Sequence, residues 1–571
     1  MKESDSKPGR SDPPPLIIGS GSVGGKAGGL IRLHDQLRGR FQGEILDFTT
    51  GIPSLAVLTT DHFDRFLQEN RLDSLRESSL SDRVISHHFL ESDLSVKITG
   101  VLREMIRHRR SPLAIRSSSY LEDQLEAPYA GIYFTKMIPN NHPDPDTRFR
   151  ALRDAIKLVY ASTFFSRARA YSRARGIDHH REKMAIIIQE VAGRESNRRF
   201  YPDISGVARS FSYYNFGDSR PEHGVVNLAL GLGKTIVDGG ISWTYNPRFP
   251  EKIPPFNSLT DRLKNTQTRF WAIDTGQVHR FNPLNETEFL TRLELSDAEY
   301  DNRLTHIAST YNAQSDTILP GIGRPGPRMI DFGPVLQYRT LPLNNTIRKV
   351  LDFCRETVES QVEIEFAVTF QPRRDHPHHF SLLQVRPMHT YDPSQSITRG
   401  NLHEKDLLVK SNQVMGNGEM SGIDHVVYLK SPDLNPRNAG EIVSEIDQIN
   451  HRLAESDRYY LLIGTGRWGS SDPCLGIPVA WPQISNARII IELKDPRSPI
   501  DYSQGSHFFH NLCNLGIFYF HVTQTPPYTL DWDWLKKQEK VYNGRHVRAV
   551  KCRQALKVYV DGRHNQGEIY R

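Results

Sequence analysis

Residues 114–119 read Ala-Ile-Arg-Ser-Ser-Ser and are followed by Glu122 and Asp123, and this stretch decides the fold that we expect. The apolar residues in front of Arg116 predict a short buried strand that ends at the arginine. A guanidinium group is a planar fork that suits the paired oxygens of a phosphate. The hydroxyls and amides of the three serines add hydrogen-bonding groups beside it. Taken alone, Arg116 is equally consistent with a surface salt bridge.

Four further motifs flank this stretch in a fixed order. They are Gly24-Gly25-Lys26-Ala27-Gly28-Gly29-Leu30, Ile186-Ile187-Ile188-Gln189-Glu190-Val191, Gly231-Leu232-Gly233-Lys234-Thr235-Ile236-Val237, and the pair Glu363-Ile364-Glu365 and Leu383-Gln384-Val385-Arg386-Pro387. Lys26 lies in a glycine-rich turn and can bring its ammonium group to a phosphate as a point charge. A triphosphate needs cations, backbone donors and a divalent metal, so the motifs together predict a nucleotide site.

The last pair of motifs supplies a candidate magnesium site. Side chains at i and i+2 of a strand share a face, so Glu363 and Glu365 point the same way, as do Gln384 and Arg386 on the next predicted strand. Mg²⁺ takes one or two carboxylates together with phosphate oxygens and water. We therefore expect Glu363 and Glu365 to bind Mg. Without the other motifs, these glutamates would more often form the solvated face of an edge strand.

In this order the motifs resemble the N-terminal ATP-binding domain of the phosphoenolpyruvate synthase and pyruvate phosphate dikinase family, over roughly residues 17–390. The resemblance implies an ATP-grasp fold, with ATP and Mg as cofactors. It implies, as nucleotide-binding residues, Lys26, Arg116, Gln189, Val191, Glu365, Gln384 and Arg386. Arg116 would also be catalytic, and Gln189 and Val191 would line the adenine slot through their backbone.

Two residues depart from the family pattern. Glu363 stands where the family commonly has Asp, and it should still bind metal. Lys234 stands where the family commonly has an acidic residue, so a charge near the nucleotide is reversed. We expect this reversal to affect turnover more than binding.

A second resemblance, to the swivelling domain that carries a phosphohistidine in the same family, rests on residues 503–517. Ser503-Gln504-Gly505-Ser506-His507-Phe508-Phe509 is followed at matching distance by Leu515-Gly516-Ile517. The resemblance implies that His507 is the catalytic nucleophile, at the start of a helix whose N-terminus would stabilise the phosphate. Gly505 replaces the family's threonine, and a packed or capping histidine is an equal alternative. His510 is the second candidate.

The chain as a whole is expected to be an α+β protein: an ATP-grasp unit followed by a smaller α/β swivelling-type domain. Short runs typical of strands (113–115, 184–188, 224–230, 364–369 and 380–385) alternate with helical stretches such as residues 146–175. We predict a disordered tail over residues 1–15, the ATP-binding domain over 16–390, a linker over 391–406 and a divergent phosphohistidine-like domain over 407–571.

Composition restricts the function further. Apolar residues make up 37% of the chain, and no apolar run reaches the roughly 20 residues that span a bilayer, so we expect a cytoplasmic protein without a membrane partner. The net charge of +6 is small for 571 residues, so nucleic acid is not an expected partner. The four cysteines lack metal-ligand spacing, which argues against a zinc site or a disulfide framework.

The two family resemblances imply a Mg-ATP-dependent phosphotransferase that passes a phosphoryl group through His507 to an unidentified acceptor, which is a small molecule or a partner chain. The family's pyruvate-binding barrel of about 250 residues has no counterpart in the 54 residues after Ile517 (571 − 517), so pyruvate is not the expected acceptor. The alternative is a catalytically impaired ATP-binding regulatory or scaffold protein. A less favoured alternative is an ATP-grasp ligase that activates a carboxylate.

Overall fold

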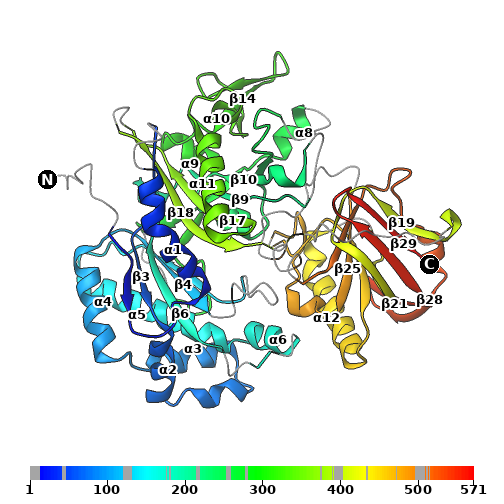
Figure 1. Cartoon of the computed structure of the whole chain (residues 1–571), viewed down its shortest axis with the longest axis horizontal. Coiled ribbons are helices and arrows are strands. Elements are labelled where there is room, and N and C mark those ends of the chain that lie inside the picture. The colour runs from blue at the N-terminus through cyan, green and yellow to red at the C-terminus, as the bar shows by residue number, and fades with distance from the viewer. Residues whose placement is uncertain are drawn as a thin grey trace.

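The computed structural model shows three units along the chain (Figure 1). It describes residues 13–41, 47–119, 122, 131–174, 177–178, 182–213, 219–252, 259–276, 281–372, 376–388, 390, 403–431, 435–470, 472–494, 508, 512 and 515–571. Most of the predicted tail, and residues 391–402 of the predicted linker, lie outside these ranges. The proposed domain limits therefore stay a prediction. None of the described helices is long and apolar enough to cross a membrane.

The first unit is a five-stranded sheet covered by helices. Its strands are, in spatial order, β1 (Leu16–Ile18), β3 (Leu55–Leu58), β6 (Met184–Glu190), β4 (Leu113–Ser119) and β5 (Thr135–Ile138). Its helices are α1 (Gly24–Phe41), α2 (Thr60–Glu69), α3 (Asp82–Glu91), α4 (Val96–His108), α5 (Pro145–Ala161) and α6 (Ser166–Ala174). Strand β6 reads Met-Ala-Ile-Ile-Ile-Gln-Glu, and its apolar residues are buried on both faces, as expected of a central strand with helices on either side.

The predicted helical stretch 146–175 is two helices separated by a 3₁₀ turn over Ser162–Phe164. Asp144 caps α5, because its carboxylate accepts hydrogen bonds from the amides of Asp146 and Thr147. The helix ends where the Ser162 hydroxyl donates to the Val159 carbonyl at 2.7 Å, a local bond that competes with the regular helical pattern.

The second unit contains three sheets. The largest has the order β11 (Trp243–Tyr245), β10 (Val225–Ala229), β9 (Ile204–Arg209), β17 (Val362–Thr369), β18 (His378–Pro387) and β2 (Phe48–Gly51). The second sheet has the order β13 (Leu290–Glu294), β12 (Arg269–Asp274), β8 (Arg199–Tyr201) and β7 (Arg194–Ser196). The third has the order β15 (Thr317–Pro320), β14 (Ala308–Asn312) and β16 (Arg328–Ile330). The helices are α7 (Lys234–Val237), α8 (Leu259–Lys264), α9 (Leu295–Tyr300), α10 (Gly333–Leu336) and α11 (Leu343–Val358).

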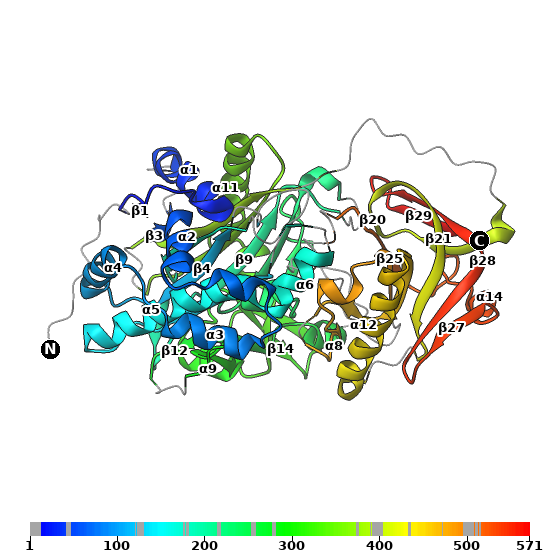
Figure 2. The same ribbon diagram turned by 90° about the horizontal axis from the view of Figure 1, so that it is seen from below.

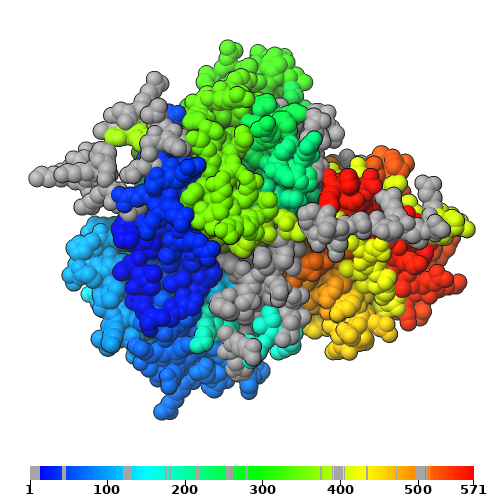
Figure 3. Space-filling model, viewed as in Figure 1, coloured from blue at the N-terminus to red at the C-terminus, as the bar shows by residue number. Residues whose placement is uncertain are grey.

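Helix α1 joins the first two units. Its buried residues Ala27, Leu30, Leu33 and Leu37 belong to the same apolar cluster as Val57 of the first sheet and Val385 of the second. The space-filling view shows the dark-blue start of the chain directly against the second unit (Figure 3). Strand β2, which follows α1 in the chain, pairs with β18 and ties the start of the chain to the second unit a second time.

The third unit is a nine-stranded sheet. Its path is β19 (Leu407–Ser411), β29 (Gln566–Tyr570), β28 (Val547–Asp561), β21 (Asn417–Leu429), β22 (Tyr460–Thr465), β25 (Ala487–Leu493), β26 (Phe518–Val522) and β20 (Val414–Met415), with β27 (Glu539–Asn543) beside β28. Because β19 and β20 occupy opposite ends of this path and are separated by only two residues, the sheet curls round an apolar core that includes Val426, Ile463 and Ile491.

Strands β21, β22, β25 and β26 run parallel to one another within this sheet. Helix α12 (Ala439–Glu455) packs on the outer face, on the side of the first two units (Figure 2). The remaining elements are short: β23 (Arg467–Trp468), β24 (Gly476–Ile477) and α14 (Trp532–Lys536). The mixture of helices and strands confirms the expected α+β class, whereas the swivelling character of this unit stays a prediction.

Candidate nucleotide site

A cavity of about 450 Å³ lies where the three units meet. The first unit contributes strands β4 and β6 to its wall. The second contributes strands β9, β17 and β18 and helix α7, and the third contributes residues 469, 479–481 and 508. Six of the predicted nucleotide-binding residues line it: Lys26, Arg116, Gln189, Val191, Glu365 and Gln384. The seventh, Arg386, does not line it, and neither does Glu363, which was predicted as a metal ligand.

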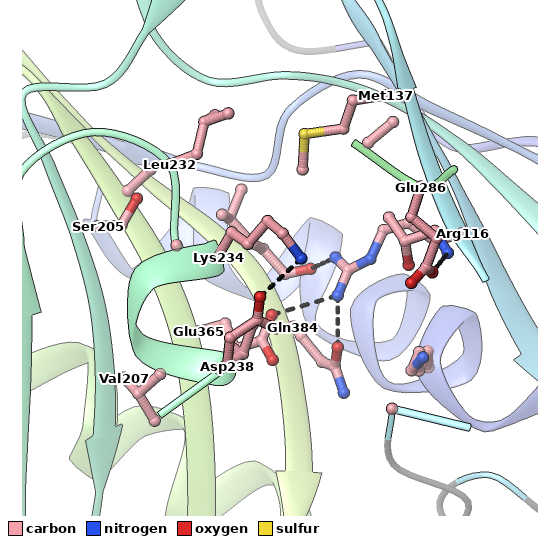
Figure 4. Close-up of a pocket in the computed structure, with 18 of the residues that line it drawn as sticks. Arg116, Met137, Ser205, Val207, Leu232, Lys234, Asp238, Glu286, Glu365 and Gln384 are labelled. Carbon is pink, nitrogen blue, oxygen red and sulfur yellow. Dashed lines mark hydrogen bonds and ion pairs between the residues drawn. The ribbon is translucent and has the colours of Figure 1, made fainter. Parts of the chain in front are cut away.

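Arg116 is the centre of a polar network between the first two units (Figure 4). Its Nη2 donates to Gln384 Oε1 at 2.6 Å and to Glu365 Oε2 at 3.2 Å, and its Nη1 donates to the Leu383 carbonyl at 3.0 Å. The side chain is only 13% exposed. The network holds the guanidinium plane at the cavity wall, so an anion entering the cavity meets a fixed cation.

Lys26 lies in the first turn of α1 and bonds back to the serine-rich stretch. Its Nζ forms an ion pair with Glu122 and contacts Ser117 Oγ at 3.4 Å. The helix can begin so close to β4 because Gly24 has a φ of 74° and a Cβ there would overlap the Ser118 carbonyl. The turn predicted around Lys26 is therefore the start of a helix, and its glycine allows the close approach of two backbones.

The two predicted metal ligands have different surroundings. Glu363 is 1% exposed, and its carboxylate binds Arg209 Nε at 2.5 Å and Arg386 Nε at 2.7 Å. Glu365 faces the cavity and contacts Arg116 alone among the ion pairs found in the described residues. The predicted neighbouring strands pair, and their register places Glu363 opposite Arg386 and Glu365 opposite Gln384.

The amide groups of Gln189 and Gln384 offer donors to a ligand. Both side chains line the cavity, and the Nε2 atom of each is buried without a hydrogen-bond partner among the described residues. A buried amide without a partner costs free energy, so these two atoms favour a polar ligand in the cavity. The backbone N–H of Val191 already donates to the Pro112 carbonyl at 2.9 Å, which leaves its carbonyl for the predicted backbone contact.

Five charged residues that were not predicted as site residues also line the cavity: Arg167, Glu190, Lys234, Asp238 and Glu286. Lys234 Nζ lies 2.7 Å from Asp238 Oδ2, one turn along α7. Burial raises the pKa of Glu286, although Lys234 and Arg167 oppose that shift. Lys234 was noticed only as a departure from the family pattern. Glu286 follows a loop without any motif, so the sequence carried no signal for it.

Positive and negative side chains are equal in number in the described part of the cavity wall. The cations are Lys26, Arg116, Arg167 and Lys234, and the anions are Glu190, Asp238, Glu286 and Glu365. A triphosphate with about four negative charges would therefore need a metal ion to enter favourably.

A magnesium ion fits the oxygen donors present. Within the described ranges no group of three or more His, Cys, Asp or Glu residues could hold a metal ion by itself. Glu365 and the Gln384 amide oxygen lie together at the cavity wall, bridged by Arg116. Mg²⁺ commonly takes one or two protein oxygens and completes its shell with phosphate and water, so this pair suffices once a phosphate is bound.

The third unit closes one side of the cavity. Arg467 Nη1 donates to the carbonyl of Gly239, just after α7, at 3.0 Å. Trp481 and Phe508 line the wall beyond it. His507 and His510 lie outside the described residues, so the proposed nucleophile is untested. Phe508, the next residue in the sequence after His507, is 9% exposed.

Comparison with protein families finds a match over the region that carries this site. The family model described as "Pyruvate phosphate dikinase, AMP/ATP-binding domain" matches residues 20–405. The chain is 25% identical to a probable phosphoenolpyruvate synthase of Methanocaldococcus jannaschii over 36% of its own length and 17% of that protein. It is 26% identical to a rifampicin phosphotransferase of Streptomyces sviceus, over 33% and 21% of the two chains.

A phosphoenolpyruvate synthase of Aeropyrum pernix is 22% identical, over 38% of this chain and 26% of the other. The matched region thus spans about a quarter or less of each relative. The match of the family model covers well over half of the chain and includes every residue of the Arg116 network. The chain belongs to the family of pyruvate phosphate dikinase AMP/ATP-binding domains.

Proposed function

We propose that the protein is a Mg-ATP-dependent phosphotransferase that moves a phosphoryl group from ATP through a histidine to an acceptor. The observation that carries this proposal is the Arg116 network, in which β4 of one sheet and β17 and β18 of another present a guanidinium, a carboxylate and an amide to one cavity. The cavity volume of about 450 Å³ lies in the range of small-molecule sites, about 300–1,000 Å³.

The six predicted residues that line the wall have distinct roles in this proposal. Lys26 and Arg116 bind phosphate oxygens, and Gln189 and Val191 face the base. A magnesium ion held by Glu365 and Gln384 would neutralise charge on the phosphates as the transferred group leaves. The charge balance of the wall supports the metal requirement, since neither sign dominates without it.

Glu363 and Arg386 have a supporting role. Their ion pair, together with Arg209, fixes β9, β17 and β18 next to the cavity. We therefore assign metal binding to Glu365 and keep Glu363 as the original, less favoured candidate.

The covalent step would use His507. A neutral imidazole nitrogen attacks a phosphorus atom of ATP, an N–P bond forms, and the P–O bond to the remaining nucleotide phosphate breaks. An acceptor oxygen then attacks the same phosphorus and releases the imidazole. Support comes from Phe508, the neighbour of His507 in sequence, which lines the ATP cavity. The acceptor is a small molecule or a partner chain.

The test is to trap phosphoprotein after incubation with Mg and ATP labelled at the β- or γ-phosphate. The proposal predicts acid-labile, base-stable label on the wild-type protein. It predicts none on His507→Ala, which should keep its ATP affinity, and none on Arg116→Ala. ATP binding without any label or ATP consumption would instead support the regulatory or scaffold alternative. Label on His507→Ala would exclude His507, and His510→Ala would be tested next.

A further inference from the structure

A second cavity, of about 550 Å³, lies in the third unit. Its wall is formed where three parallel strands end: residues 428–431 at the end of β21, 463–465 at the end of β22 and 493–494 at the end of β25. Gln524, just after the parallel strand β26, also contributes. The carboxyl edge of parallel strands is where sheets of this kind commonly bind ligands, because the loops there are not needed to hold the strands together.

The charge of this cavity differs from that of the ATP cavity. Its described wall has four cations, Lys430, Lys494, Lys536 and Arg548, and no Asp or Glu. Among the described residues, no carboxylate forms an ion pair with Lys430, Lys536 or Arg548. The Lys430 ammonium is held by the Gly544 carbonyl, and Arg548 Nε donates to Asn543 Oδ1 at 3.2 Å. The wall should attract an anion without help from a metal ion.

Aromatic rings stand beside these cations. Tyr428 and Trp532 both line the cavity and contact each other edge to face, with ring centroids 5.8 Å apart. The Arg548 guanidinium lies 6.0 Å from the Tyr428 ring centroid, and its Nη1 is 3.4 Å from the Tyr428 hydroxyl. Lysines recognise phosphate as point charges, whereas aromatic rings bind flat apolar groups through their faces and edges.

From this combination we propose that the second cavity binds a small molecule that carries a phosphate group on a flat ring. The inference does not depend on ATP use, because the two cavities share no lining residue among those described. The cavities are nevertheless close along the chain: Thr465 lines the second one and Gly469 lines the ATP cavity.

The experiment compares phenyl phosphate with inorganic phosphate by ligand-observed NMR titration of the full chain in the presence of a chelator. Phenyl phosphate should bind without Mg and several-fold more tightly than inorganic phosphate. Equal affinities would overturn the role of the rings, and no binding of either probe would overturn the site.

Two neighbouring lysines supply a matched pair of variants. Lys536 lines the cavity, Lys537 does not, and both are exposed, so neither change should affect folding. Lys536→Ala should weaken phenyl phosphate about tenfold, the value of one charge-assisted contact, and Lys537→Ala should change it less than about twofold. Equal losses in both variants would show a diffuse surface charge instead of a site. Loss of phenyl phosphate binding in Arg116→Ala would place the probe in the ATP cavity and overturn the proposal.

Discussion

Replacing each glutamate of β17 with glutamine should separate fold stability from metal binding. Glu363 lies between two guanidinium groups, and the side chains of Glu363, Arg209 and Arg386 are 1%, 3% and 5% exposed. Glu363→Gln removes the carboxylate and leaves two buried cations without their counter-charge. Breaking a buried ion pair in this way costs about 3–5 kcal/mol, which should lower the melting temperature by several degrees or more.

Glu365→Gln should have the opposite profile. The side chain is 16% exposed, and Arg116 keeps its hydrogen bonds to the Leu383 carbonyl and to Gln384, so the stability loss should stay near or below about 1 kcal/mol. Loss of a direct metal ligand should instead weaken Mg-ATP by at least about tenfold, because even indirect supporting contacts of a metal contribute that much.

Scanning fluorimetry and calorimetric titration with Mg-ATP on the same preparations give both quantities. Glu363→Asp serves as the control, since it keeps the carboxylate and should retain most of the stability. The reasoning is refuted if Glu363→Gln melts like the wild type but loses Mg-ATP binding. In that case Glu363 would be a metal ligand, as the sequence alone predicted.

Two further predictions concern charge. Lys234→Met should weaken ATP binding several-fold, because it removes a cation from a wall whose charges balance, whereas Asp238→Asn should strengthen ATP binding. If both variants bind ATP with the wild-type affinity in a binding titration, the charge argument is wrong. Burial raises the pKa of Glu182 from 4.5 to about 7, so between these pH values the folded state binds more protons and the free energy of unfolding falls as pH rises. Glu182→Gln should flatten this fall in melting curves taken from pH 5 to 8, and an unchanged pH dependence would count against a raised pKa.

Local patterns predicted the strands of the candidate site well, although β4 continues to Ser119 instead of ending at Arg116. The runs at 113–115, 184–188 and 364–369 fall within β4, β6 and β17, since a buried apolar run flanked by polar residues has few alternatives. Sequence alternation paired Glu363 with Glu365 and Gln384 with Arg386, and the structure adds the register, in which Glu363 lies opposite Arg386 and Glu365 opposite Gln384. These features depend on neighbours in the sequence or on the period of a strand.

Long-range partners were not predictable in the same way. Arg209 lies 154 residues before Glu363, and no local signal links the two, so the ion pair that occupies Glu363 could not be foreseen. The charge pair of Lys234 and Asp238 follows from helical spacing, but its position at the cavity depends on how two sheets meet. The third unit was harder still, because its sheet curls through contacts between β19, β20 and distant strands.

Calorimetric titration of the wild-type chain with ATP, once with Mg and once with a chelator, tests the central claim most directly. The balanced charge of the cavity wall predicts saturable binding with Mg and binding at least about tenfold weaker without it. Equal affinity under both conditions would contradict the magnesium site at Glu365 and Gln384. Absence of ATP binding in the presence of Mg would contradict the nucleotide site itself.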